Sequence, residues 1–248
     1  MAADECHEVV RRAGIRQGAV TFFAHLDGAI FVFVYSSLLL PDIADDDRRQ
    51  EVSFLVESLA FVAFLLVSGA WMGWRFYRFY RRRTDWLGDG EEPTVERVDR
   101  VLRLPFDLAA QGLVPWLVAS VAFAGLGLAL GEPFAEGVRT STTIVLGGLV
   151  SCALAFLLTE RMLRPVFALA LGGASPERSR TLGVRPRLLL SWALGSGIPL
   201  VGLAVLPLKA EGEGVGPAVV GLALGALVVG LLATVLAARS VGDPLDEV

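Results

Sequence analysis

His25 and Asp27 are ionisable residues inside a long apolar segment, where residues 22–28 read FFAHLDG. Ionisable side chains within a membrane segment are costly and are candidates for binding a ligand, moving a proton or sensing a signal. Two residues apart on a helix, they face different directions and cannot pair with each other. We expect one of them either to make a polar contact within a helical bundle, with Gln111 or the start of the third apolar segment, or to form a sensing site.

Three carboxylates define a second candidate site. Glu57 lies toward the outer end of the second apolar segment, and Asp42 and Glu132 lie near it in the predicted outer loops. Such a cluster of carboxylates could hold a cation. The alternative for Glu57 is an ordinary solvated helix end, so the pattern predicts no firm metal site.

The chain contains no catalytic motif of a soluble enzyme. It has no phosphate-binding glycine loop, no GxSxG sequence, no CxxC pair and no His-rich metal box. Cys6 and Cys152 are far apart in the sequence, which predicts neither a disulfide nor a metal cluster. The sequence therefore predicts no catalytic residue and no cofactor for this chain.

The elements that position these residues are apolar helices. Hydrophobic residues make up 54% of the 248-residue chain, which is typical of a membrane protein. Six stretches reach the length of about 20 residues that a helix needs to cross a bilayer. The predicted fold is all-α and polytopic, with spans near 18–40, 52–77, 108–130, 141–163, 188–208 and 216–237, a tail at 1–17 and a linker start at 238–248.

The basic residues predict the orientation of these spans. With a cytoplasmic amino terminus, 18 of the 22 Lys and Arg residues lie on the inner side. Only Arg48, Arg49, Arg139 and Lys209 lie outside. Because cytoplasmic loops carry the excess of Lys and Arg, both termini are predicted to be cytoplasmic and the chain to lie in the inner (plasma) membrane. The outer loops are too short to fold as sensory domains, so any signal must be read by the helices, for example from membrane lipids.

Small residues and prolines within the spans have two interpretations each. Gly221 and Gly225 form a GxxxG pair, which fits either close packing inside the bundle or a dimer seam. Pro115 and Pro199 interrupt helix hydrogen bonding, which fits either a packing kink or a hinge that transmits movement.

Two inner segments carry further signals. Residues 94–100 could form a short amphipathic helix with Thr94 near its N-cap. The aromatic and basic run at 71–83 is an interfacial anchor and resembles a nucleic-acid patch only superficially.

Asp107 lies near the inner boundary of the third span. It could pair with Arg103, four residues earlier.

The ends of the fourth and sixth spans are similar to each other. Each apolar run is followed by a basic residue and then a proline, Pro165 and Pro244, and these prolines lie 79 residues apart. This pattern fits two related helical hairpins, although proline and arginine commonly end membrane helices.

Three stretches resemble a known family. Residues 183–202 (GVRPRLLLSWALGSGIPLVG) look like the start of the fifth membrane helix in actinobacterial class III adenylate cyclases that carry a six-helix anchor and a HAMP linker. Residues 159–166 resemble the end of their preceding helix. Residues 239–245, with Arg239, Asp243, Pro244 and Leu245, resemble the start of their HAMP domain, which is also common to other HAMP receptors.

The resemblance implies a membrane-anchor and receptor module that forms a homodimer and regulates a downstream HAMP and cyclase domain. That domain would make cAMP from ATP with Mg²⁺ or Mn²⁺. The metal-binding aspartates and the other catalytic residues of such cyclases have no counterpart in this chain. Two alternatives are a transporter or channel, for which repeats and proline-broken helices are typical, and the sensor half of a histidine kinase.

Overall fold

The regular elements of the chain are all helical in the part that the structure, a computed structural model, describes. The described residues are 3–39, 47–89, 91, 93–172, 192–205 and 215–242, and none of them lies in a strand. The predicted all-α class is therefore confirmed for these residues. The α-helices are α1 (Ala3–Val34), α2 (Asp47–Gly88), α3 (Val95–Leu102), α4 (Leu104–Ala129), α5 (Phe134–Met162), α6 (Arg164–Leu171), α8 (Ile198–Val205) and α9 (Val215–Gly242). Two π-helices, η1 (Tyr35–Leu39) and η3 (Ala193–Gly197), accompany them.

Four helices, α1, α2, α4 and α5, are long and apolar enough to cross a membrane. A shorter apolar stretch, Val219–Val235, lies within α9. These helices indicate a membrane protein, because lipid offers no partner for an unpaired backbone group and a helix satisfies its own. Of the predicted span at 188–208, only residues 192–205 are described.

The first two long helices extend beyond the predicted spans. The predicted tail at 1–17 is mostly helix, since α1 starts at Ala3, and α2 continues to Gly88 rather than ending near residue 77. An apolar stretch shows which residues lie in the lipid. A helix can continue into water for as long as its residues favour the helical conformation. Arginine is a good helix former, so the run of arginines in 78–83 continues α2 beyond the apolar span.

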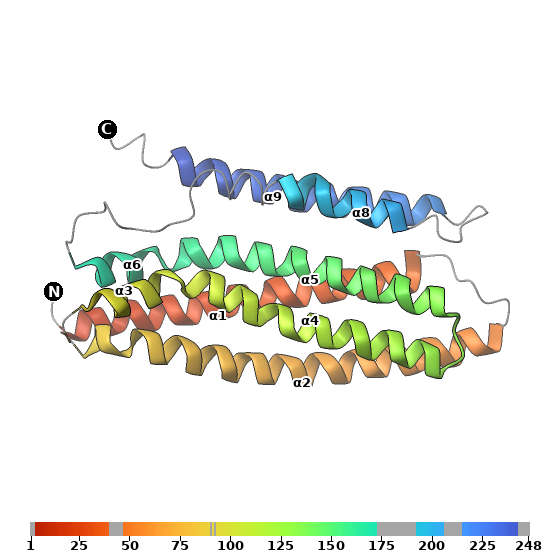
Figure 1. Cartoon of the computed structure of the whole chain (residues 1–248), viewed down its shortest axis with the longest axis horizontal. Helices are drawn as coiled ribbons and strands as arrows, with labels where there is room; N and C mark the ends of the chain where they lie inside the picture. The colour runs from red at the N-terminus through yellow and green to blue at the C-terminus, as the bar shows by residue number, and fades with distance from the viewer. Residues whose placement is uncertain are drawn as a thin grey trace.

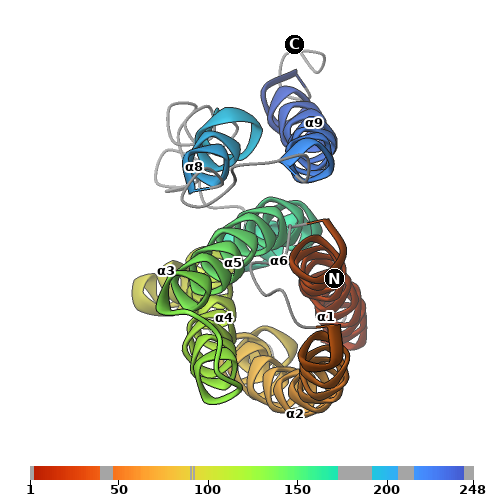
Figure 2. The same cartoon turned by 90° about the vertical axis from the view of Figure 1, so that its right-hand side faces the viewer.

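The four long helices form a ring, in the order α1, α2, α4, α5, when the molecule is seen end-on (Figure 2). Each helix contacts its two neighbours in this ring. The helices α8 and α9 form a separate layer that lies beside α5 (Figure 1). The first residues of α1, the last residues of α9, and both short helices α3 and α6 lie at the same end of the molecule (Figure 1). This arrangement places the arginine-rich segments together at one end.

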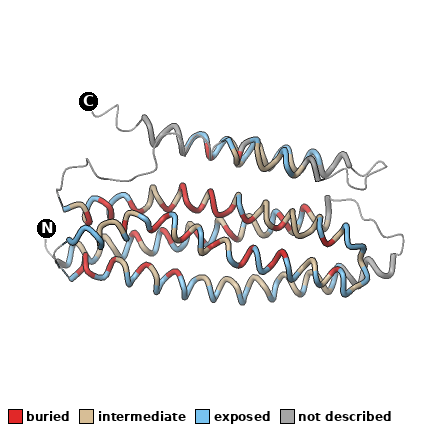
Figure 3. Tube along the Cα trace, viewed as in Figure 1, coloured by how far each residue is buried: buried red, intermediate tan, exposed pale blue. Residues whose placement is uncertain are grey.

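The best-buried cluster lies at that same end. Val101, Leu104, Leu163, Val166 and Ala170 are each fully buried there. Buried positions elsewhere follow the inward faces of the long helices, whereas outward faces are exposed (Figure 3). The exposed apolar faces suit contact with lipid rather than water.

Two proline junctions build this cluster. Pro105 and Pro165 each occupy the first turn of a helix, α4 and α6, where a missing backbone N–H costs nothing. Each follows a single residue in the αR conformation, Arg103 or Leu163, that ends the preceding helix. The chain therefore turns sharply without a loop, and α3 and α6 come into contact.

The short helix α3 was predicted from its amphipathic pattern, and Thr94 caps it as expected. The Thr94 hydroxyl accepts a hydrogen bond from the backbone N–H of Arg97 at 3.3 Å. Replacing Thr94 with alanine removes this bond and is expected to destabilise α3 by about 1 kcal/mol. Amide hydrogen exchange of residues 95–102 should then be faster, while exchange in the middle of α4 stays unchanged. Unchanged exchange in α3 would contradict the capping role.

Candidate functional site

His25 is buried at the centre of the ring and is hydrogen-bonded to a neighbouring helix. The indole Nε1–H of Trp116 on α4 donates to His25 Nδ1 at 2.9 Å. Both side chains are buried. Because indole is only a donor, His25 Nδ1 must be unprotonated, so the neutral ring carries its hydrogen on Nε2. Among the described residues, no group accepts a hydrogen bond from His25 Nε2.

Glycines let three helices meet around this pair. A Cβ atom on Gly112 of α4 would lie 2.8 Å from His25 Nε2 and 3.6 Å from Cys152 Sγ of α5. A Cβ atom on Gly148 of α5 would lie 2.5 Å from Trp116 Cγ. Small residues at such contacts allow membrane helices to approach closely. The geometry therefore fixes α1, α4 and α5 as a tightly packed unit around His25 and Trp116.

The other polar partners differ from those expected. Among the described residues Gln111 makes no hydrogen bond to His25 or Asp27; its side-chain oxygen accepts a hydrogen bond from Arg75 Nε at 3.0 Å, which links α4 to α2. Asp27 is exposed on the outer side of α1, in keeping with its angular separation from His25. Only His25 of the predicted trio therefore lies at the centre of the bundle.

Asp107 also has a different partner from the one expected. It forms an ion pair with Arg83 of α2, while Arg103 pairs with Asp99 inside α3 at 2.9 Å. Arg83 additionally donates to the backbone carbonyl oxygen of Arg100 at 3.0 Å. The helix boundary at residue 103 directs Arg103 back toward α3, which leaves Asp107 to tie α4 to α2.

The Arg83–Asp107 pair predicts a measurable contribution to stability. Both side chains are less than one-third exposed, at 22% and 28%. Asp107→Asn is expected to lower the free energy of unfolding by about 1–2 kcal/mol, because it leaves a partly buried guanidinium poorly paired. Asp99→Asn, which breaks a more exposed pair, is the matched control and should cost at most about 0.5 kcal/mol. Thermal unfolding in detergent compares the two, and equal effects would contradict the cross-helix role.

A cavity of about 1340 Å³ lies inside the ring of helices, mainly between α1 and α2. His25, Trp116 and Pro115 form part of its wall. At one end the wall includes Arg11 and Arg81. At the opposite end it includes several acidic side chains, namely Glu57, Glu132 and Glu136. The cavity therefore runs along the helices from the end that holds its arginines, which Asp85 and Asp89 also line and which we call the basic end, to an acidic end.

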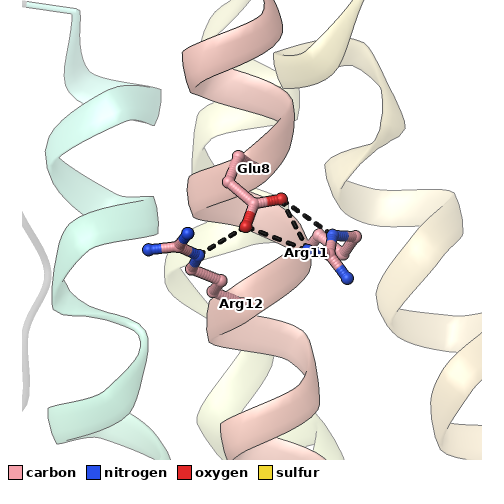
Figure 4. A network of polar contacts seen from close by, with 3 residues as sticks. All are labelled: Glu8, Arg11 and Arg12. Carbon is pink, nitrogen blue, oxygen red and sulfur yellow. Dashed lines mark hydrogen bonds and ion pairs between the residues drawn. The ribbon is translucent and has the colours of Figure 1, made fainter.

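The basic end is also ordered by ion pairs. Glu8 accepts hydrogen bonds from Arg11 and Arg12 along α1 (Figure 4). Tyr80 of α2 donates its hydroxyl to the backbone carbonyl oxygen of Val10 at 2.8 Å. These contacts join the amino-terminal part of α1 to the end of α2.

The predicted outer cation site is only partly observable. Glu57 and Glu132 line the same cavity, as the prediction of a shared outer end implies, whereas Asp42 lies outside the described residues. Within the described part of the chain, no three His, Cys, Asp or Glu side chains are grouped to hold a metal ion. The cation site stays a prediction.

The predicted hinge and packing residues lie at helix contacts. Pro115 is a buried position inside α4, which continues on both sides of it. Pro199 is the second residue of α8, directly after the π-helix η3. A Cβ atom on Gly225 of α9 would lie 2.7 Å from Phe31 of α1, so this glycine packs inside the molecule. Gly221 lies one turn earlier on α9.

The predicted output linker lies mostly beyond the described residues. Arg239 is within α9, and Asp243, Pro244 and Leu245 are outside the described part. The comparison of Pro165 with Pro244 therefore stays untested, although Pro165 does begin a helix, α6.

Sequence reasoning missed Trp116, Gly112 and Gly148. Each is an ordinary residue for a membrane helix, and its role depends on which helix faces it. The only indication in the sequence was that they lie near the middle of predicted spans, as Pro115 and His25 do. That position does not predict which residues contact each other.

Comparisons with known proteins identify relatives over half of the chain. The uncharacterized protein Rv1319c of Mycobacterium tuberculosis (strain ATCC 25618 / H37Rv) is 32% identical over 135 residues, which is 54% of this chain and 25% of that protein. The uncharacterized protein Rv1318c of the same strain is 31% identical over 121 residues, covering 49% and 22%. The uncharacterized protein Mb1353c of Mycobacterium bovis (strain ATCC BAA-935 / AF2122/97) is 32% identical over 135 residues.

The matched region spans about a quarter of the length of these relatives. No family model matches the chain. No solved structure matches it either.

Proposed function

We propose that this chain is the membrane-anchor and receptor module of a class III adenylate cyclase, which forms a homodimer and regulates a HAMP-linked domain that makes cAMP from ATP. The resemblance of residues 183–202 and 239–245 to such cyclases supports this assignment. The relatives are about four times as long as the region they share with this chain, so they have room for further domains.

The observation that carries the proposal is the continuity of α9 with the bundle. This helix runs without interruption from Val215 to Gly242, into the segment that resembles a HAMP start. Its Ala233 is fully buried in a cluster with Phe156 and Leu157 of α5. Its Gly225 packs against Phe31 of α1. A displacement of α1 or α5 would therefore move α9 and the linker after it.

The proposed topology has six spans in the inner membrane with both termini in the cytoplasm. The charge distribution supports it, as does the position of the α1 start and the α9 end at one end of the molecule (Figure 1). Alkaline phosphatase, active only in the periplasm, provides a test when fused after Val248. We expect an inactive fusion there and an active fusion within residues 131–133, and the reverse pattern would overturn the topology.

Asp27 supports an assembly of two copies. It is exposed about 13 Å into the predicted span, at 1.5 Å per residue from residue 18. A carboxylate facing lipid at this depth is costly unless it meets a polar partner. A second copy of the chain would supply protein surface there and keep this group away from lipid.

The chemistry of the proposed cyclase belongs to its catalytic domain. Mg²⁺ or Mn²⁺ would activate ATP for cyclisation there, and the described residues of this chain include no group of ligands for such a metal. The part of this chain is to hold two such domains together and to bias their geometry through α9.

A chimera tests the function. Residues 1–248 are joined to the HAMP and catalytic domains of a class III adenylate cyclase, and cAMP is measured in a cyclase-deficient bacterium. Gly225→Leu, which disrupts the α9–α1 contact, is expected to change cAMP output about fivefold or more, within the usual range of coupling between sites. Gly125→Leu places the same side chain on the exposed surface of α4, where a Cβ has open space, and should change nothing.

Replacing the bundle with an unrelated dimerising anchor completes the test. If the anchor gives the same cAMP output and regulation, and Gly225→Leu has no effect, the receptor role fails.

The cavity favours a transporter as the second candidate function. It runs along the helices and contains the titratable His25, as transport pathways do. Uptake assays on the chain in liposomes separate this candidate from a receptor. The sensor half of a histidine kinase stays an alternative, and only the HAMP-like segment supports it.

A further inference from the structure

The cavity in the ring passes two points where α1 and α2 touch. At the basic end, Tyr80 of α2 packs on Gly14 of α1, since a Cβ on Gly14 would lie 2.6 Å from Tyr80 Cε1. At the acidic end, the rings of Phe33 and Phe61 stack with centroids 4.4 Å apart. Between Gly14 and Phe33 the helix rises about 28 Å, at 1.5 Å per residue. The cavity between these contacts is therefore nearly as long as the hydrocarbon core of a bilayer is thick, about 30 Å.

Three glycines line the stretch of the cavity between these two contacts. Gly18 on α1 and Gly73 on α2 line the cavity, and a Cβ on either would have no heavy atom within 4 Å. Gly69, one turn before Gly73, would meet only the ring of Phe22, at 3.9 Å. Glycines at the α1–α4–α5 contact, by contrast, are filled by neighbouring side chains. The open glycines leave room for an added chain of methylene groups along the backbone.

Several polar side chains of the cavity wall are satisfied by the protein itself, whereas His25 Nε2 and Ser36 Oγ are buried there without a hydrogen-bond partner among the described residues. Gln17 Nε2 donates to Thr21 Oγ1 at 2.9 Å, and Ser68 donates to the backbone carbonyl oxygen of Phe64 at 2.6 Å. His25 Nδ1 accepts from Trp116. These groups therefore have less to offer a polar solute, and apolar side chains such as Phe22, Val62, Leu65, Leu66 and Met72 dominate the remaining wall. Such a wall favours an apolar occupant.

The two ends of the cavity differ in charge. Arg11 and Arg81 line the end near Tyr80, and Arg81 holds its present partners loosely, Asp85 at 3.4 Å and the Tyr77 hydroxyl at 3.3 Å. Asp85 and Asp89 line this end as well, so its wall carries as many aspartates as arginines, and Arg11 and Arg81 are the groups in it that can bind an anion. The far end carries the glutamates Glu57, Glu132 and Glu136. A ligand with one anionic group and one long chain would place the anion near the arginines.

We propose that the cavity binds a long-chain fatty acid, with its carboxylate at Arg11 and Arg81 and its chain along the stretch lined by Gly18, Gly69 and Gly73. This fatty acid would be the ligand of the proposed receptor. Only the effect of its binding on cAMP output rests on the proposed function. Binding to the purified chain is a property that exists with or without a cyclase output, so the two can fail separately.

The test measures binding of radiolabelled palmitic acid to the full chain in nanodiscs. Hexadecanol, which has the same chain length without the charge, and octanoic acid, which has the charge without the length, serve as competitors. We expect unlabelled palmitic acid to compete and the other two to compete at least about tenfold less well, because charge-assisted hydrogen bonds are the stronger ones. Equal competition by hexadecanol would overturn the carboxylate site.

Matched variants locate the ligand. Gly73→Phe fills the stretch of the cavity lined by these glycines and should weaken palmitic acid binding at least about tenfold, whereas Gly125→Phe adds the same ring to open space outside the cavity and should not. Arg81→Gln should weaken binding about threefold to tenfold. Arg78→Gln, at an arginine that stacks over Trp74 and does not line the cavity, is its control.

Crosslinking to the unmodified protein locates the ligand even if the Gly73→Phe variant fails to fold. Palmitic acid with a photoreactive group at its chain end should label the unmodified protein within α1 or α4 near His25 and Trp116. Labelling confined to the outer faces of the helices, or retention of a two-chain phospholipid that palmitic acid does not displace, would overturn the proposal.

Discussion

Gly148→Val is expected to disrupt the packing of α5 against α4 and to lower the free energy of unfolding by about 3 kcal/mol or more. A Cβ at position 148 would lie 2.5 Å from Trp116 Cγ and 2.6 Å from Trp116 Cβ. The Trp116 Cβ is fixed to its own backbone, so no change of rotamer relieves the clash and the helices must separate. Overpacking of a buried contact typically costs about 1–3 kcal/mol, and a contact with an immovable atom belongs at the upper end.

Thermal unfolding in detergent measures this effect. A loss of about 3 kcal/mol lowers Tm by roughly 6–12 °C in a chain of this size. Gly125→Val is the control, because it adds the same side chain where a Cβ has no neighbour within 4 Å. If both variants unfold at the same temperature, Gly148 does not pack against Trp116.

Trp116→Phe is expected to cost about 1–3 kcal/mol through the loss of one hydrogen bond. Phenylalanine keeps an aromatic ring in the contact but removes the Nε1–H that donates to His25. His25 Nδ1 is then buried without a donor, which is more costly than a lost hydrogen bond alone. Trp192→Phe, at a residue that is 62% exposed, controls for the exchange of aromatic rings.

A double-mutant cycle isolates the Trp116–His25 interaction. His25→Leu removes the acceptor, and in its presence Trp116→Phe should cost roughly 1 kcal/mol less than in the wild type, within the range of hydrogen bonds between membrane helices. Strictly additive effects of the two substitutions would show that the hydrogen bond contributes nothing.

The sequence was sufficient to predict the helical class and much of its outline. Apolar stretches of about 20 residues have one stable form in lipid, which is the reason the four long helices coincide with predicted spans. The short helix α3 was predictable because its cap and its pattern are local. The ends of α1 and α2 were not predicted, because hydropathy detects lipid contact and the helices continue past it.

The partners of the polar residues depend on the order of the helices in the ring. Gln111 meets Arg75 and Asp107 meets Arg83 because α4 lies beside α2, and spacing along one segment does not contain that information. His25 was singled out correctly as a residue inside the bundle, but its partner Trp116 follows from the close approach that Gly112 and Gly148 allow. The cavity likewise depends on four helices at once.

The π-helix η3 marks a point where this helix can lose a residue without changing its phase. Its turn at Ala193–Gly197 holds more residues than an α-helical turn, just before Pro199. It places Leu194, which is 1% exposed, in the cluster with Phe156 and Ala233. A π-turn absorbs its extra residue locally, so deleting only Ser196 would let an ordinary α-helix form through this point while the residues on either side keep their faces. The same deletion within an α-helix such as α9 would instead rotate the residues on one side of it by about 100° relative to the other side.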